Sequence, residues 1–275
     1  MKNQLLTFCA ITLISFSSFS QDDNTVTKIS DNLGNTLSSK AIYKGTLLTG
    51  VRFSWSQAQV GFTNGSNGGF KSTMKALPSA YFGYGISKNV DIHVSASYLQ
   101  NEWESDGIAG PSNGGFNGFG GLTIGSKVNL FKQKKWLPEI ALNVDASIPN
   151  ADFGFRELMK LQSTLAWGYY LGDNFRVGGN FIMRNFINSS YSETFTTDFS
   201  LTFNTRYELS NGLGFFADVM VGSFNFNSMF PTVGVYYRYK QNIQLHISAG
   251  KYYTFQSSVD SEYVSAGFSW LLFNK

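Results

Sequence analysis

The sequence predicts an all-β protein, an antiparallel transmembrane β-barrel of about twelve strands with short periplasmic turns and longer extracellular loops. Three observations predict it. First, apolar and polar residues alternate along many short runs, as they do in strands whose successive side chains point to opposite faces. Second, charged residues make up only 14% of the chain and aromatic residues 16%, which suits strands whose outer face meets lipid. Third, the connections alternate between short and long.

The clearest hairpin lies at residues 118–148. Residues 118–130 and 139–148 both alternate apolar and polar side chains, and a short basic turn at 131–136 joins them. Each run has roughly the ten residues that a tilted strand needs to cross a bilayer. We interpret this hairpin as the unit from which the whole barrel is built.

The first residues are typical of an export signal. Residues 1–20 combine Lys2, a short apolar core and small residues before a cut predicted after Ser20, so they are expected to form a cleaved signal peptide. Residues 21–44 are polar and are predicted to form a flexible periplasmic segment. The barrel is predicted to occupy residues 45–275.

The remaining strands and connections follow the same pattern. The alternating runs are 47–55, 80–86, 90–98, 122–130, 139–148, 161–171, 175–184, 198–208, 213–221, 233–239, 243–249 and 264–272. Short turns are predicted at 87–89, 131–136, 172–174, 210–212 and 240–242, and longer loops at 59–73, 101–117, 149–156, 187–195 and 223–231. An even number of strands places both termini in the periplasm. The aromatic last strand, which ends at Phe273, resembles the signal that such barrels present to the barrel-assembly machinery.

The polar face of the strands carries the candidate functional residues. The predicted lumen-lining residues are Arg52, Asp91, His93, Lys127, Glu139, Asp145, Arg176, Arg184, Asp198, Arg206, Glu208, Asp218, Arg238 and His246. A soluble sandwich would have to bury or expose one whole face at large cost, which favours a membrane barrel. The mixture of signs fits either a hydrated lumen whose charges satisfy one another or a selective pore with a charged constriction.

Composition and motifs exclude several other functions. The net charge of +3 indicates no nucleic-acid partner. The single cysteine, Cys9, lies in the predicted signal peptide, and His93 and His246 are not close in sequence, so we expect no metal and no cofactor. Phosphate loops and paired-carboxylate motifs are absent from the sequence, and we therefore expect no enzyme and no catalytic residues.

Several strand-and-turn segments also resemble a known family. They are Gly45–Leu47, Leu77–Pro78, Tyr84–Ile92, Gly118–Lys127, Trp136–Pro138 and Ser147–Pro149. Together they are similar to the outer-membrane family named for the MetA-pathway of phenol degradation, whose members are described as transporters. The family usually has an Asp where this chain has Gly121. The resemblance implies a barrel that passes small, hydrophobic or aromatic compounds, and it implies no catalytic residues.

Two hypotheses for function follow. The first is a passive channel or transporter for small molecules in the outer membrane of a Gram-negative cell. The second is a non-transporting structural or adhesion barrel with a filled lumen, in which the loops at 59–73 and 101–117 carry the function.

Overall fold

The computed structural model describes residues 37–61, 69–107, 110–148, 158–188, 195–222, 228–240, 242–254 and 259–273. The predicted signal peptide and residues 21–36 lie outside this part of the chain. The strands are β1 (Thr46–Gly61), β2 (Gly69–Gly85), β3 (Val90–Gly107), β4 (Gly110–Phe131), β5 (Glu139–Ile148), β6 (Leu158–Leu171), β7 (Phe175–Asn188), β8 (Phe195–Glu208), β9 (Leu213–Gly222), β10 (Ser228–Tyr239), β11 (Ile243–Thr254) and β12 (Val259–Phe273). Within the described residues no helix is long and apolar enough to cross a membrane.

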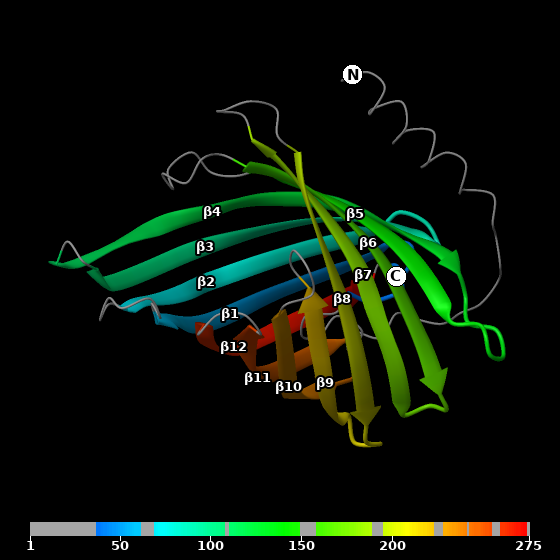
Figure 1. The fold of residues 1–275 in the computed structure, drawn as a ribbon. Helices are drawn as coiled ribbons and strands as arrows, with labels where there is room; N and C mark the ends of the chain where they lie inside the picture. The colour runs from blue at the N-terminus through cyan, green and yellow to red at the C-terminus, as the bar shows by residue number, and fades with distance from the viewer. Residues whose placement is uncertain are drawn as a thin grey trace.

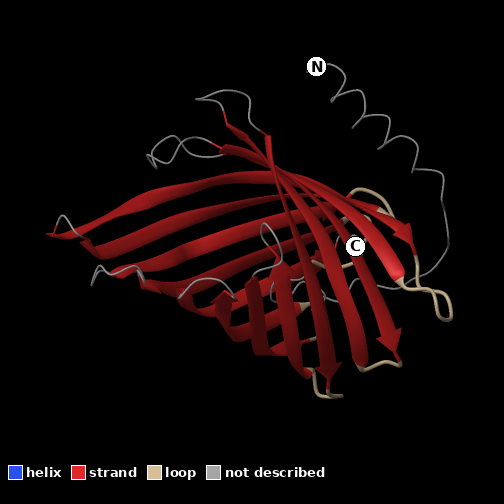
Figure 2. Cartoon of the chain, viewed as in Figure 1, coloured by secondary structure: helices blue, strands red, loops and turns tan. Residues whose placement is uncertain are grey.

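The twelve strands form one closed antiparallel barrel (Figures 1 and 2). Each strand pairs with its neighbours in the sequence, and β12 closes the barrel against β1, from Thr46 opposite Phe273 to Val60 opposite Val259. Closure leaves no free sheet edge around the barrel, although β4 extends from Gly110 to Gly121 beyond its pairing with β5, which begins at Leu122. The predicted fold class is confirmed.

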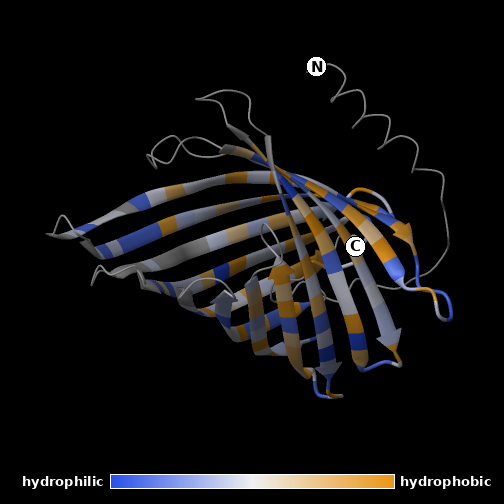
Figure 3. Cartoon of the chain, viewed as in Figure 1, coloured by the Kyte–Doolittle hydropathy of each residue, from blue (hydrophilic) through white to orange (hydrophobic). Residues whose placement is uncertain are grey.

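Hydrophilic and hydrophobic residues alternate along the strands (Figure 3), and their burial shows that the polar residues face inward and the apolar residues outward. On β8, Thr202 and Asn204 are buried, whereas the intervening Phe203 is 50% exposed. On β11, Leu245 and Ile247 are exposed in the same way. A barrel that turns its large apolar side chains outward requires hydrocarbon around it, so this surface is the lipid-facing band of an outer-membrane barrel.

The short turns lie at one end of the barrel, which we assign as periplasmic. Residues 172–174 and 210–212 connect paired strands as predicted, and Gly172 and Gly212 have φ angles of 75° and 84°. Only glycine adopts this left-handed conformation without strain, which explains why these turns can be so short.

The predicted bounds of the long loops at 59–73 and 101–117 were wrong, whereas residues 62–68 and 108–109 within them lie outside the described part of the chain. Strand β1 continues to Gly61, β2 begins at Gly69, and β3 and β4 continue until Gly107 pairs with Gly110. These residues escaped detection because strands that protrude from the bilayer have water on both faces, so their side chains need not alternate. The predicted loop at 149–156 lies outside the described residues. Most of the predicted loops at 187–195 and 223–231 also lie outside them.

The protruding part begins at a row of β-bulges. The register of β2 with both β1 and β3 shifts at the same place on β2, between Ala76 and Ser79, and the register of β3 with β4 shifts between Ala96 and Tyr98 on β3. These shifts lie side by side on adjacent strands. Bulges bend a strand, and beyond this row β2, β3 and β4 extend far past the other strands at the left of Figure 1. Since about ten residues suffice to cross a bilayer, roughly half of the 22-residue β4 lies beyond it.

The residues before β1 enter the barrel. We call residues 37–44 the strap. Ser38, Ser39, Ala41 and Ile42 of the strap are buried, and Ile42 packs against Leu48, Leu271 and Tyr81 on the inner wall. The structure therefore places the end of the segment predicted as a flexible periplasmic leader inside the barrel mouth.

Candidate functional site in the barrel interior

All predicted lumen residues occupy inward positions on their strands. Asp91, Lys127, Glu139, Asp145, Arg176, Asp198, Arg206, Asp218 and His246 are buried, and Arg52, His93, Arg184, Glu208 and Arg238 are partly buried. The barrel brings them into separate groups on different parts of the wall.

The first group lies on β2, β3 and β5 near the periplasmic end. His93 Nε2 is 2.7 Å from Asp145 Oδ1, and His93 Nδ1 is 3.5 Å from Asp91 Oδ1. Asn143 donates to the second oxygen of Asp145 at 2.5 Å. The ring of Tyr81 stacks on His93 with centroids 5.7 Å apart. The histidine is thus held between two carboxylates in a shell of protein atoms.

The strap contacts several predicted lumen residues directly. Asp91, Lys127, Glu139 and Arg176 each form a hydrogen bond to a strap residue between Ser39 and Ile42. These four charges therefore position a segment of the chain, a role that charge and periodicity alone did not indicate.

A second group joins β6, β7 and β8. Arg184 Nη1 lies 3.1 Å from Asp198 Oδ2 and donates to Ser200 Oγ at 3.0 Å. Arg184 Nε donates to Gln162 Oε1 at 3.2 Å. The guanidinium is thus fixed by neighbours on both adjacent strands.

A third group joins β8 and β10 on the far wall. Glu208 pairs with Arg238 and also accepts a hydrogen bond from Tyr236 Oη at 3.1 Å. The ring of Tyr236 packs against Phe216 in a small buried cluster. The second and third groups therefore each pair one acid with one base.

Some buried polar atoms of this wall have no hydrogen-bond partner in the described protein. Both ring nitrogens of His246 and both amide atoms of Asn204 are of this kind, as is the hydroxyl of Thr202. Such groups are stable when an enclosed water or a ligand supplies the missing hydrogen bonds.

A cavity of about 380 Å³ lies where the bulge row crosses the barrel wall. It is lined by Ser79, Ser95, Ala96, Ser97, Gly120, Gly121, Leu122, Thr123, Ser147, Ile148, Lys160 and Phe186. Ser95, Thr123 and Ser147 face inward, and Thr123 and Ser147 hydrogen-bond at 2.8 Å. The cavity thus combines hydroxyls with one amine, that of Lys160, and one aromatic ring, that of Phe186.

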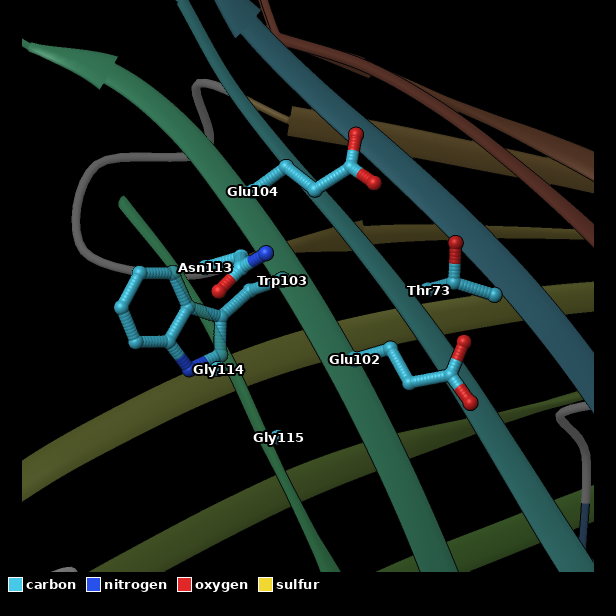
Figure 4. Close-up of a pocket in the computed structure, with 7 residues that line it drawn as sticks. All are labelled: Thr73, Glu102, Trp103, Glu104, Asn113, Gly114 and Gly115. Atoms are coloured by element: carbon cyan, nitrogen blue, oxygen red, sulfur yellow. The ribbon is translucent and has the colours of Figure 1, made fainter. Parts of the chain in front are cut away.

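A second cavity, of about 520 Å³, lies on the protruding sheet (Figure 4). Its lining residues are Thr73, Glu102, Trp103, Glu104, Asn113, Gly114 and Gly115. The indole of Trp103 lies over Gly114, where an added Cβ would stand 2.6 Å from Cζ2 of the ring. Glu102 and Glu104 give this exposed surface a negative charge.

Sequence reasoning missed the uncharged members of the interior. Asn129, Gln162 and the strap residue Ser39 all hydrogen-bond to residues named above or to the strap. Asn129 and Gln162 lie on the polar face of their strands, a signal that could have found them. Ser39 carries no such signal, because the strap has no periodicity.

The described residues contain no group of three His, Cys, Asp or Glu side chains that could hold a metal ion. His93, Asp91 and Asp145 are close together, and His93 Nε2 is hydrogen-bonded to Asp145 Oδ1.

Comparison with known proteins assigns the family. A model of the family described as "Putative MetA-pathway of phenol degradation" matches residues 56–273, most of the chain. The chain belongs to this family. The resemblance predicted from the sequence is therefore confirmed, and a comparison with curated protein sequences finds no significant match.

The chain is similar in fold to several solved structures. The crystal structure of the COG4313 outer membrane channel from Pseudomonas putida F1 has a TM-score of 0.64 at 12% identity, covering 88% of this chain and 99% of that chain. The translocator domain of the autotransporter NalP from Neisseria meningitidis has a TM-score of 0.51 at 8% identity, covering 98% and 96%. The Pseudomonas putida toluene transporter TodX has a TM-score of 0.45 at 8% identity, covering 82% and 88%. The first two structures, with TM-scores above 0.5, establish the fold, that of an outer-membrane barrel.

Proposed function

We propose that the protein is a passive outer-membrane channel for small molecules, including aromatic compounds. The observation that carries the proposal is the polar, charge-paired interior of a closed barrel whose outer face is apolar. An interior that served only to fill the barrel could be apolar, whereas paired charges such as Arg184 with Asp198 suit a polar passage. Family membership and the fold shared with the Pseudomonas putida F1 channel support the same function.

The cavity at the bulge row suggests the chemical class of cargo. The hydroxyls of Ser95, Thr123 and Ser147 can exchange hydrogen bonds with a phenolic hydroxyl, and the amine of Lys160 can attract an anionic group. The ring of Phe186 offers an apolar surface for an aromatic ring. A small hydroxylated aromatic compound matches this combination, and its volume suits the cavity of about 380 Å³.

Reconstitution tests the proposal. Protein purified from outer membranes and inserted into planar bilayers should give step currents in potassium chloride. The same protein in liposomes should speed uptake of 4-hydroxybenzoate, an aromatic anion that crosses lipid slowly. Heat-denatured protein is the control. Absence of both currents and uptake above that of empty liposomes would contradict a channel.

A lysine variant tests the cargo assignment. Lys160→Met keeps the length of the side chain but removes its charge, so it should slow 4-hydroxybenzoate uptake more than the uptake of a neutral sugar. Lys134→Met changes an exposed lysine in a turn and is the matched control. If the two substitutions slowed uptake equally, the cavity would not lie on the path of the cargo.

A second candidate function rests on the protruding sheet. The negatively charged pocket around Glu102, Trp103 and Glu104 lies outside the barrel proper and offers a surface for an external partner (Figure 4). This observation favours a structural or adhesion role. Replacing residues 101–117 by a short turn between Gln100 and Gly118 separates the roles, because adhesion would be lost while conductance through the barrel remained.

We further propose that residues 1–20 are removed on export and that the barrel-assembly machinery inserts the chain. Support for export comes from the outer-membrane fold and from the apolar core of residues 1–20. Mass spectrometry of the purified protein should find Gln21 as its first residue.

A further inference from the structure

We propose that the turn between β4 and β5 binds the headgroup of an anionic phospholipid in the periplasmic leaflet of the membrane. We call this turn, residues 131–137, the lysine turn. The inference goes beyond the proposed channel and does not depend on it, because the turn lies on the rim of the barrel and not in its interior. The residues of the lysine turn are Phe131, Lys132, Gln133, Lys134, Lys135, Trp136 and Leu137.

The lysine turn carries three positive charges and no negative one. Lys134 and Lys135 are exposed, and neither ammonium group forms an ion pair within the described part of the chain. Glu139, the first acid after the turn, is buried and faces the barrel interior, where it accepts a hydrogen bond from Ser39. An anion that approaches the turn from outside therefore meets only cations of this segment.

The periplasmic rim as a whole has the same sign. The turn at 87–89 lies beside the lysine turn, since the N–H of Asn129, just before it, donates to the Asn89 carbonyl at 2.8 Å. Basic segments of this kind attract anionic lipid headgroups. The five short turns together hold five lysines and one acid, namely Lys88, Lys132, Lys134, Lys135, Lys240 and Asp173.

Large apolar side chains stand beside these charges. Trp136 is 77% exposed and Phe131 is 64% exposed, and Leu137 is exposed as well. Phe131 lies opposite Ile140, on the lipid-facing side of β5. An indole ring is more favourable at the interface between lipid and water than in water. Lysines next to exposed aromatic rings form the kind of surface that enters the headgroup region of an anionic bilayer.

The end of β6 holds the lysine turn in a fixed conformation. Strands β5 and β6 pair only as far as Glu139 opposite Gly168. Beyond this point the Gln133 side chain takes the place of a neighbouring strand. Its amide nitrogen donates to the Tyr170 carbonyl at 3.0 Å, and its oxygen accepts the Tyr170 N–H at 2.7 Å. Binding therefore does not have to order the turn, which favours affinity.

A further contact directs the tip of the lysine turn toward lipid. Tyr169 shares the outer face of β6 with the exposed Leu165, and its hydroxyl donates to the carbonyl of Lys135. Two backbone hydrogen bonds between Lys134 and Leu137, of 3.2 and 2.8 Å, close the tip. The turn projects past the neighbouring strand ends at the right of Figure 1. The lysines are thus held beside the lipid-facing wall and not over the mouth of the barrel.

The backbone at Lys135 also indicates a role for the charge. Lys135 has a φ angle of 49°, in the left-handed region that glycine adopts with less strain. The turns with Gly172 and Gly212 use glycine in this conformation. A lysine here costs backbone stability and places a positive charge at the tip of the turn.

Lipid retention tests the inference. Protein purified from outer membranes is transferred to a neutral detergent that contains either phosphatidylglycerol or phosphatidylcholine, and native mass spectrometry counts the retained lipids. The unaltered protein should retain phosphatidylglycerol in preference to phosphatidylcholine. Lys132→Gln with Lys134→Gln and Lys135→Gln should weaken retention of phosphatidylglycerol roughly ten-fold or more, because the three charges act on the same headgroup.

A matched control removes the same charge from the other half of the barrel. Lys71→Gln with Lys75→Gln and Lys251→Gln takes three lysines from the extracellular parts of β2 and β11, and should leave the retention of phosphatidylglycerol unchanged. Equal weakening by the two triple variants would overturn the inference, because it would show an effect of net charge alone. Equal retention of the two lipids by the unaltered protein would overturn it as well.

The fluorescence of Trp136 tests whether the lysine turn enters the headgroup region. The signal of Trp136 is the difference between the unaltered protein and Trp136→Phe, both inserted into vesicles of lipid with brominated acyl chains. Bromine should quench this signal more strongly in phosphatidylglycerol than in phosphatidylcholine. A signal that is not quenched, or is quenched equally in the two lipids, would contradict binding of an anionic headgroup at this turn.

Lys135→Gly separates lipid binding from folding. Glycine relieves the positive φ angle, so this variant should form a heat-modifiable barrel with an unchanged or higher urea midpoint. Its retention of phosphatidylglycerol should nevertheless fall roughly two- to five-fold, because one of three charges is lost. Retention equal to that of the unaltered protein would overturn the assignment of Lys135. Conductance should be unaffected by this substitution, so failure of the channel function and failure of this inference are distinguishable.

Discussion

His93 Nε2 and Asp145 Oδ1 lie 2.7 Å apart although β4 separates their strands. The contact is possible because the inward position between them on β4 is Gly125, where an added Cβ would collide with both side chains. A missing side chain thus allows a histidine and a carboxylate to meet across three strands. The consequence is that the interior of this barrel depends on its glycines as well as on its charges.

Gly125→Ala should therefore break this contact. Loss of a buried hydrogen bond to a charged group costs about 1.5–3 kcal/mol, so the midpoint of urea unfolding should fall measurably. Gly50→Ala is the control, because an added Cβ there would stand 3.0 Å from the Phe268 carbonyl and 3.1 Å from Ser269 Oγ, close but not overlapping. Equal destabilisation by the two substitutions would argue against a special role for the pair.

The Glu208–Arg238 pair offers a double-mutant test. Arg238→Ala leaves a largely buried carboxylate without its cation and should destabilise the barrel by about 3–5 kcal/mol. Removing both charges, with Glu208→Gln in the same chain, should recover part of that loss, because no uncompensated charge remains. Unfolding in urea, followed by tryptophan fluorescence, measures both. Additive losses would indicate that the two side chains do not interact.

The loss of folding free energy caused by a charged substitution on the outer face should depend on its depth in the bilayer. Phe203, near the middle of β8, is 50% exposed toward the lipid, and Phe203→Arg should cost about 2–4 kcal/mol. Tyr207→Arg, at the periplasmic end of the same strand, should cost about 0–1 kcal/mol because the arginine can reach the interface. Refolding equilibria in lipid vesicles measure the difference. A reversed order would contradict the placement of the bilayer around β8.

The protruding sheet should be dispensable for folding. Replacing residues 101–117 by a short turn removes only parts of β3 and β4 beyond the bulge row, and every strand keeps the roughly ten residues that span the bilayer. The shortened protein should retain heat-modifiable migration and an unchanged urea midpoint. A barrel that fails to form would show that the extension contributes to closure.

The sequence by itself determined the fold class, the number of strands and the short turns. Within the bilayer each strand has lipid on one side and a polar interior on the other, so alternation is imposed at every position and can be read from single strands. The turn glycines, such as Gly172 and Gly212, could also be predicted from the local sequence. A tight turn between two antiparallel strands favours a residue with left-handed backbone conformation.

Only the tertiary structure showed how far some strands extend and which side chains meet, because local sequence patterns do not carry this information. Strands at 101–117 went unrecognised because water on both faces removes the alternation, although their backbones still pair. The sequence placed His93, Asp145 and the other polar residues on one face but did not indicate which of them would meet, because that depends on the register between strands and on residues such as Gly125. The strap shows the difference most clearly. Ser39 and Ile42 lie in a segment without periodicity, and only closure of the barrel brings Arg176, Asp91 and the strap within hydrogen-bonding distance.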